Sequence, residues 1–180
     1  MGTRSSCSST RNWRAASCLH EESDRKNKVD VRAKLKELGL ELPVAAKPVA
    51  AYVPAIRTGN IVFTAGQLPL VNGEMAGVGK VDGEITPERA KELAQVCALN
   101  ALAAVETVAD VNKITKIVRV VGYVNGVPGY INAPVVVNGA SELFLAIWGD
   151  GAKHARSAVG IAELPLNSPV EIELTVEITD

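Results

Sequence analysis

Aromatic residues are scarce in this chain of 180 residues, since Phe, Trp and Tyr together make up only 4% of it. That scarcity argues against a surface on which the bases of single-stranded nucleic acid stack. The three cysteines, Cys7, Cys18 and Cys97, form neither a metal-binding spacing nor a disulfide framework. No apolar run has the length that a membrane span needs. We therefore expect a protein with no metal site and no membrane partner, in a reducing, intracellular location.

Charge is balanced overall but unevenly distributed. The net charge is −1, yet residues 1–34 carry a charge of +4 and the remaining residues carry −5. The main body of the chain is therefore mildly acidic. An acidic body argues against binding to a phosphate backbone, so we expect no nucleic-acid partner.

Residues 1–27 differ in composition from the rest of the chain. Up to His20 they contain three arginines, five serines and no acidic residue, as organelle transit peptides do. The first six residues also fit a loose N-myristoylation pattern, with Cys7 beside it. We interpret the segment as a disordered tail, or as the product of a start codon placed too early. The expected location is the cytoplasm, with the mitochondrion or another organelle as the alternative if the segment is a transit peptide.

Residues 28–50 are expected to form an N-terminal helix and a linker, ahead of a main domain at residues 51–180. Asp30 is a suitable N-cap for a helix over residues 31–38. Gly39 is suited to end that helix, because glycine adopts the left-handed conformation common just after a helix.

The main domain shows strand and helix patterns in the order β-β-β-α-β-α-β-β. An N-cap followed by proline, Thr86-Pro87, marks the start of the first long helix. Two helices on one face of a mixed sheet give a two-layer α+β domain. The expected strands are residues 51–57, 61–65, 75–81, 114–124, 155–161 and 170–178, and the expected helices are residues 87–108 and 134–148.

The final strand alternates between apolar and polar residues. Its apolar set must face the helices, so its other face, which begins with Glu171, meets water, a partner subunit or a ligand. Much of that second sheet face is expected to be apolar outside the final strand. An apolar face left open in one chain predicts an assembly that covers it, such as a trimer. The apolar set comprises Val170, Ile172, Leu174, Val176 and Ile178.

Two charged residues stand near the starts of the last two strands. Arg156 and Glu171 each lie among residues typical of a buried sheet, where a charge needs a partner or a task. A guanidinium offers parallel donors to the two oxygens of a carboxylate, and a glutamate can hold or activate a water molecule. The pair therefore indicates a small carboxylate substrate and a hydrolytic step. Alternatively, Glu171 serves only as the ion-pair partner of Arg156.

Other polar residues are interpreted as structural. His154 precedes a strand, and a lone histidine there is more often structural than catalytic. Asn100 lies in the middle of the first long helix, where a packing or capping contact is expected. Asn138-Gly139 could be a polar break within the second helix, and Glu173 is expected on an inter-subunit surface.

Six short motifs of the main domain occur in an order typical of one family. They are Tyr52-Val53-Pro54, the run GNIVFTAGQLP from Gly59 to Pro69, Asn138, Ala155-Arg156-Ser157-Ala158-Val159, Leu164-Pro165 and Val170-Glu171-Ile172-Glu173. Together they resemble the RidA (YjgF/YER057c/UK114) family. The resemblance covers about residues 51–178, and the early helix indicates a divergent branch with an N-terminal extension.

This resemblance implies a chorismate-mutase-like fold and a homotrimer with sites at the subunit interfaces. It also implies hydrolysis of reactive enamines and imines, such as 2-aminoacrylate, to 2-keto acids and ammonia, without a metal or an organic cofactor. Carried over by motif, Arg156 would bind the substrate carboxylate and Glu171 would place the attacking water. The pocket would be lined by Tyr52, Gly66 and Asn138, and the backbone around Ala158 would meet the imine nitrogen.

Two positions depart from the family pattern. The usual serine before Gly-Gln is Ala65 here, and the usual cysteine after Arg-Ser is Ala158. The first change removes a hydroxyl from the expected pocket, and the second removes a thiol. A second hypothesis is therefore a non-catalytic, trimeric protein that binds a small carboxylate and acts in regulation or scavenging.

Overall fold

The computed structural model describes residues 29–45 and 51–179. The predictions for residues 1–27 lie outside these ranges. The described chain begins with a short helix, α2 (Val31–Glu37), whose N-cap is Asp30, as expected. The Asp30 side chain accepts a hydrogen bond from the backbone N–H of Ala33 at 3.0 Å and so satisfies one of the free donors at the helix start.

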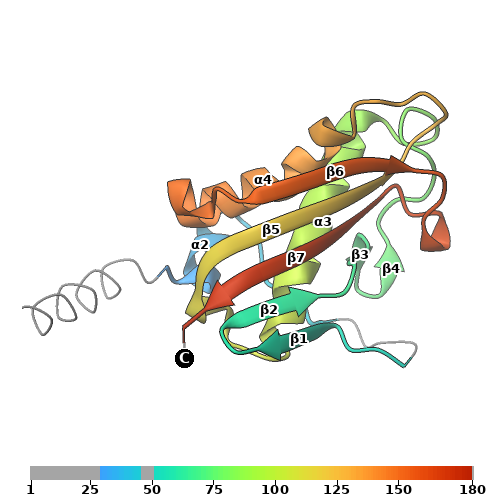
Figure 1. Cartoon of the computed structure of the whole chain (residues 1–180). Coiled ribbons are helices and arrows are strands. Elements are labelled where there is room, and N and C mark those ends of the chain that lie inside the picture. Colours follow the sequence, from blue (N-terminus) through green and yellow to red (C-terminus); the bar gives the residue numbers. More distant parts are fainter. Residues whose placement is uncertain (1–28, 46–50, 180) are drawn as a thin grey trace, which may run out of the picture.

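A five-stranded sheet forms one layer of the molecule (Figure 1). Its central strand, β7, pairs antiparallel with both of its neighbours, whereas β5 and β6 pair in parallel. Parallel neighbours need a crossover connection, and the helix α4 supplies it. In spatial order the strands are β1 (Ala55–Thr58), β2 (Ile61–Thr64), β7 (Val170–Ile178), β5 (Ile114–Asn125) and β6 (Ala155–Ile161).

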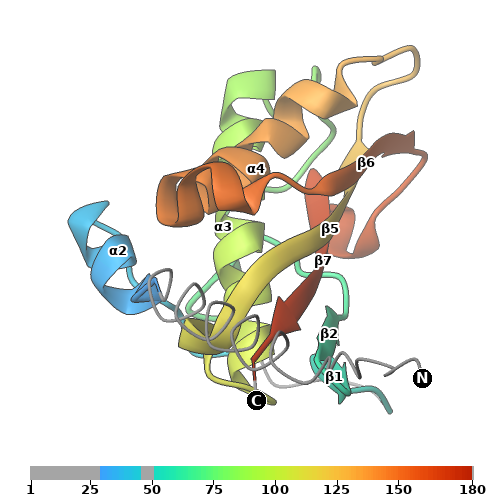
Figure 2. The ribbon, with the colours of Figure 1, turned by 60° about the vertical axis from the view of Figure 1, so that its left-hand side comes forward.

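Two long helices, α3 (Pro87–Glu106) and α4 (Ala133–Trp148), form the second layer. Both lie on the same side of the sheet, as the rotated view in Figure 2 shows. Thr86 caps α3, since its hydroxyl accepts a hydrogen bond from Arg89 N at 3.2 Å, and Pro87 occupies the first turn. The two-layer α+β fold expected from the sequence is confirmed.

The hydrophobic core lies between the two layers. Val170, Ile172, Leu174, Val176 and Ile178 of β7 are all buried, and the residues between them are only partly buried. This alternation is the predicted one, and it assigns each face of the sheet. The face toward α3 and α4 is the helix face; the other, which carries Glu171, is called here the open face.

The prediction of a third strand over residues 75–81 is wrong. Two short strands, β3 (Leu70–Val71) and β4 (Glu74–Met75), form a small separate hairpin instead. Asn72 and Gly73 form its turn with positive φ angles of 54° and 86°, as a two-residue hairpin turn requires. The chain after β4 does not continue as a strand, because Gly79 has a φ angle of 126°, outside the extended conformation of a strand.

Three short 3₁₀ turns and α2 complete the described structure. The turns are η1 (Val111–Lys113), η2 (Gly149–Ala152) and η3 (Pro165–Asn167). The helix α2 packs onto the main domain, since Val31 and Leu35 are buried in the same core. The backbone N–H of Val31 also donates to Asn112 Oδ1 at 2.9 Å. In residues 29–45 and 51–179, no helix has the length and apolarity to cross a membrane.

Candidate functional site

Arg156 is held at the edge of the sheet by two polar residues of α4. It is the second residue of β6 and pairs in the register with Val120 of β5, whose buried side chain belongs to the core. Its Nη1 donates to Asn138 Oδ1 at 2.8 Å and to Ser141 Oγ at 3.1 Å. Asn138 and Ser141 are three residues apart, so they share one face of the helix. The guanidinium is therefore oriented by α4 from the helix face of the sheet.

His154 extends this hydrogen-bond network. Its Nε2 lies 3.1 Å from Ser141 Oγ, and its Nδ1 lies 2.6 Å from the carbonyl oxygen of Ala152. The imidazole packs edge-on against Phe144, with 6.2 Å between the ring centroids. Both ring nitrogens have a partner, in line with the structural role expected for this histidine.

The side chain of Arg156 is exposed, so the expectation of a buried arginine is wrong. The reason is that β6 pairs with β5 alone and is therefore the edge of the sheet. Ala158, two residues further along β6, also faces the helices and packs partly against the core. We call Asn138, Ser141, His154, Arg156 and Ala158 the arginine cluster.

Glu171 lies on the open face, half-buried opposite Tyr123 of β5. Gly66 covers the carboxyl group so closely that a Cβ at this position would collide with Glu171 Oε1. Gly66 is held there because the next residue, Gln67, exchanges two backbone hydrogen bonds with Ile172, at 2.9 and 3.0 Å. The structure thus brings together two residues that the sequence motifs placed in one pocket.

The surroundings of Glu171 oppose its ionisation. Burial raises the pKa of Glu171 above its ordinary value, and the carboxylate of Glu173, two residues along β7, raises it further. The hydroxyl of Tyr123 donates to Glu173 Oε1 at 3.3 Å. A glutamate whose pKa lies closer to neutral can accept a proton and return it within one reaction. We call Gly66, Tyr123, Glu171 and Glu173 the glutamate cluster.

Tyr52 is exposed and lies two residues before Pro54. Its side chain is 54% exposed, and no hydrogen bond within the described chain joins it to either cluster. Its segment runs beside the loop that carries Gly66, because Ala65 N donates to Pro54 O at 2.9 Å. Of the residues expected to line the pocket, Tyr52 is therefore the least constrained.

Asn100 fixes the loop that follows Gly66. From the middle of α3, its Nδ2 donates to the carbonyl oxygens of Leu68 and Leu70, at 2.9 and 3.0 Å. This is the packing contact expected for Asn100. It anchors the loop to the helix layer and so supports the position of Gly66 over Glu171.

The two clusters lie on opposite faces of the sheet. In the register, Arg156 pairs with Val120, whereas Glu171 pairs with Tyr123, three residues further along β5. Strand spacing and rise then separate the two residues by roughly 10 Å across the sheet and roughly 10 Å along it. One chain therefore cannot present both side chains to the same small molecule. The alternative of an ion pair between Arg156 and Glu171 within one chain is excluded.

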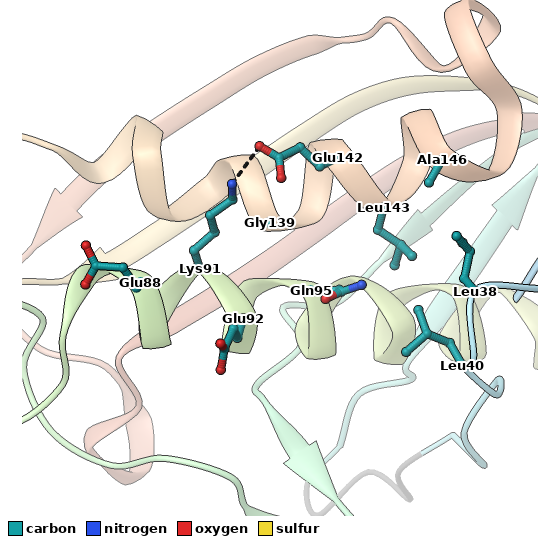
Figure 3. Close-up of a pocket in the computed structure, with 10 residues that line it drawn as sticks. All are labelled: Leu38, Leu40, Glu88, Lys91, Glu92, Gln95, Gly139, Glu142, Leu143 and Ala146. Carbon is teal, nitrogen blue, oxygen red and sulfur yellow. Dashed lines mark ion pairs between the residues drawn. The ribbon is translucent and has the colours of Figure 1, made fainter.

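The described surface also contains hollows that no member of either cluster lines. A groove of about 640 Å³ runs between α3, α4 and the segment that follows α2, with Lys91 and Glu142 forming an ion pair of 2.8 Å across it (Figure 3). A smaller hollow of about 330 Å³ lies beside Gln67 and Asn100. In residues 29–45 and 51–179, no group of three or more His, Cys, Asp and Glu side chains could hold a metal ion.

Sequence reasoning missed Ser141 and Tyr123. A signal for Ser141 was present, because it follows Asn138 by three residues on an otherwise apolar helix, so the two share a face. Tyr123 carried no such signal. Its place beside Glu171 and Glu173 follows from the register between β5 and β7, which the sequence does not show.

Comparison with known proteins places this fold in a family. Residues 32–178 match the family model described as "YjgF/chorismate_mutase-like, putative endoribonuclease". The chain is 32% identical over 152 residues to protein TCP17 of Trypanosoma cruzi, a match that covers 83% of this chain and 95% of that protein.

Two solved structures extend the comparison. The protein Atu1372 of Agrobacterium tumefaciens, whose function is unknown, is 38% identical with a TM-score of 0.77, and the match covers 91% of this chain and 99% of that one. The yjgF gene product of E. coli is 26% identical with a TM-score of 0.55, over 74% of this chain and 92% of that one. The fold, the matched residues and these relatives together show that the chain belongs to the YjgF/chorismate-mutase-like family.

Proposed function

We propose that this protein is an enamine/imine deaminase that hydrolyses 2-aminoacrylate-type compounds to 2-keto acids and ammonia. The observation that carries the proposal is the pair of preorganised groups: a guanidinium oriented by Asn138 and Ser141, and a half-buried glutamate under Gly66. A guanidinium held in this way suits a carboxylate ligand. A glutamate with a raised pKa suits proton transfer to and from water.

The proposal requires an assembly, because the two clusters lie on opposite faces of the sheet. In a homotrimer, the arginine cluster of one subunit would meet the glutamate cluster of its neighbour. Exposed apolar side chains on the open face support such contacts: Ile56, Phe63 and Val159 are 60%, 45% and 44% exposed in the single chain. Apolar groups in such positions are stabilised when a partner subunit covers them.

The proposed reaction begins with an enamine that takes a proton on its terminal carbon and becomes an imine. The carboxylate binds Arg156, which places the imine carbon beside Glu171 of the neighbouring subunit. Glu171 takes a proton from water as the oxygen bonds to the imine carbon and the C=N double bond becomes a single bond, and Glu171 then returns this proton to the nitrogen. The resulting carbinolamine transfers its hydroxyl proton through Glu171 to the nitrogen as the C–N bond breaks, which forms the C=O bond of the 2-keto acid and releases ammonia. An imine is already electrophilic, so positioning and one acid-base group suffice.

The remaining predicted site residues have supporting roles in this proposal. Asn138 orients the guanidinium through its 2.8 Å hydrogen bond. Gly66 has no side chain, so the loop lies directly against the carboxyl group of Glu171 and shields it from bulk water. Tyr52 would line the entrance, and the backbone at Ala158, on the same strand and face as Arg156, would contact the imine nitrogen.

A non-catalytic carboxylate-binding protein is the second candidate. Ala65 and Ala158 favour it, because neither offers the hydroxyl or thiol usual at these positions. Both candidates require Arg156, but only the deaminase requires Glu171. An endoribonuclease, as in the family description, is less compatible with this site, because Glu171 and Glu173 on adjacent positions of the open face would repel a phosphate.

The test measures turnover and binding separately. An amino-acid oxidase generates an imine in the assay, and its decay is followed with and without the protein; binding of 2-oxobutanoate is measured by calorimetry. Arg156→Ala should lower kcat/KM by on the order of 100-fold and abolish binding, because it removes the paired donors. Glu171→Ala should lower kcat by about 10²–10⁴-fold and leave binding within a few fold.

Arg89→Ala and Glu92→Ala are the matched controls. These residues form an exposed ion pair of 2.6 Å at the start of α3, so their loss should change neither quantity. Full turnover by Glu171→Ala would exclude the water-placing role. Binding without turnover in the wild-type protein would favour the non-catalytic candidate, and cleavage of RNA that depends on Glu171 would favour the endoribonuclease.

A further inference from the structure

We propose that Ser141 and His154 are positioning residues that fix the guanidinium of Arg156 and thereby set the affinity for the substrate carboxylate. The inference rests on the proposed function, in which Arg156 binds that carboxylate. Ser141 contacts Arg156 directly, and His154 contacts Ser141. In this proposal neither side chain contacts the substrate. The three side chains come from the middle of α4, the residue before β6, and β6 itself.

The hydrogen-bond network assigns the tautomer of His154. A carbonyl oxygen only accepts, so the 2.6 Å contact with Ala152 O places the proton on Nδ1. In the neutral ring, Nε2 is then an acceptor, and the hydroxyl of Ser141, 3.1 Å away, donates to it. The Ser141 hydroxyl is thereby turned so that a lone pair of Oγ faces Arg156 Nη1, at 3.1 Å.

Both hydrogens of Arg156 Nη1 are used by the protein. One points to Asn138 Oδ1 and the other to Ser141 Oγ. Among the residues that the structure describes, none accepts a hydrogen bond from Nε or Nη2 of Arg156. These two nitrogens form a planar fork whose donors are parallel, and such a fork matches the two oxygens of a carboxylate.

Ser141 and His154 are more firmly held by their surroundings than the exposed side chain of Arg156. Ser141 is only 9% exposed, on a helix packed in the core, and His154 is restrained by the Phe144 ring as well as by the Ala152 carbonyl. An arginine on an exposed edge strand otherwise loses considerable rotamer freedom when it binds a ligand. A preset guanidinium avoids much of that entropic cost, which strengthens binding without acting on the chemical step.

The experiment compares four variants of the full chain, with 2-oxobutanoate as the binding probe and the oxidase-coupled assay for turnover. Ser141→Ala should raise KM and the Kd for 2-oxobutanoate about tenfold, with kcat within about twofold, because a hydrogen bond to a charged group is lost. Ser141→Thr retains the hydroxyl and should restore most of the affinity. His154→Ala should weaken binding less than Ser141→Ala does.

The double variant Ser141→Ala/His154→Ala distinguishes a positioning role from two separate effects. If His154 acts through Ser141, the double variant should bind no more weakly than Ser141→Ala alone. Thr107→Val is the matched control: it removes a hydroxyl that donates to Ala104 O at 2.7 Å at the end of α3, and should leave KM unchanged. Should Ser141→Ala fail to fold, His154→Ala carries the test, because its side chain lies outside the helix.

The outcomes separate this inference from the proposed function. If the wild-type protein neither binds 2-oxobutanoate nor hydrolyses the imine, or if Arg156→Ala retains both, the proposed function fails. If Arg156→Ala loses both while Ser141→Ala and His154→Ala keep the wild-type KM, only the positioning role is overturned. An equal loss of kcat in all variants would likewise contradict it.

Discussion

Glu171 is both covered by a neighbouring loop and placed beside a second carboxylate. Gly66 covers its carboxyl group, and Glu173 stands two residues away on the same face of the same strand. Burial and the second carboxylate both disfavour the charged form, which is why the pKa of Glu171 is raised. An arrangement that opposes ionisation weakens the fold at neutral pH while it favours acid-base chemistry.

The stability of the fold should therefore depend on pH through Glu171. Because its pKa is higher in the folded chain than the ordinary value of 4.5, the folded chain retains a proton that the unfolded chain releases. The free energy of unfolding then falls as pH rises from about 4.5 through the raised pKa. Glu171→Gln lacks this fall, so it should gain stability relative to the wild type as pH rises.

Urea denaturation at pH 4, 5.5 and 7, at one protein concentration, measures this difference. The stability gap between Glu171→Gln and the wild type should widen toward pH 7. Glu173→Gln removes the smaller of the two causes of the raised Glu171 pKa. It should therefore reduce only part of the decrease in unfolding free energy that the wild type shows as pH rises. A gap that stays constant over this range would show that the fold does not oppose ionisation of Glu171.

At the scale of elements, the contact between α3 and α4 depends on Gly139. The sequence Asn138-Gly139 suggested a polar break, but α4 runs through it without interruption. Gly139 instead lies directly on the α3 backbone, where a Cβ would collide with the carbonyl oxygen of Lys91 and approach its carbon to 2.9 Å (Figure 3). Asn138, the preceding residue, accepts the hydrogen bond from Arg156 of β6.

Gly139→Ala should destabilise the protein, although glycine-to-alanine in a helix normally stabilises by about 1 kcal/mol. The added methyl meets rigid backbone, and overpacking of this kind costs about 1–3 kcal/mol, so the loss exceeds the gain. The urea midpoint measures the net effect. Gly151→Ala is the control, since nothing lies within 4 Å of its Cβ position and its φ is not in the left-handed region. Equal midpoints for the two variants would contradict the steric argument.

At the scale of the whole molecule, the two clusters cannot act together without a second subunit. The open face carries the exposed Ile56 and Phe63 near one edge of the sheet and Val159 at the other edge. A partner that covers these side chains would bury apolar surface, which favours association by about 25 cal/mol per Å² of apolar area. Assembly and the proposed catalysis should therefore be lost together.

Phe63→Glu should convert the expected trimer to a monomer, because a charge on the open face would have to be buried in the interface. Sedimentation velocity at micromolar concentration measures the assembly, and the imine assay should show loss of turnover in the same variant. Val108→Glu is the control: Val108 is also exposed, at 36%, but follows the end of α3, away from the open face. A wild-type protein that sediments as a monomer while retaining turnover would contradict both the assembly and the shared site.

Local patterns in the sequence determined much of this fold. The alternation of β7 set its two faces, Asp30 and Thr86 set two helix starts, and the bounds of β6 and β7 were as predicted. These features depend on interactions within a few residues, so the sequence states them directly. The motifs also selected Arg156 and Glu171, because a charge on a strand pattern is visible without a structure.

Only the tertiary structure decided where those charges meet other groups. The register of β5 with β6 and β7 put Arg156 and Glu171 on opposite faces, and it brought Tyr123 to the glutamate cluster. The packing of α4 on the sheet joined Ser141 to Arg156, and none of the five strands of the sheet comes from residues 75–81. Register and helix packing follow from contacts between distant segments, and a side chain's face changes with a shift of one residue, so no local pattern could fix them.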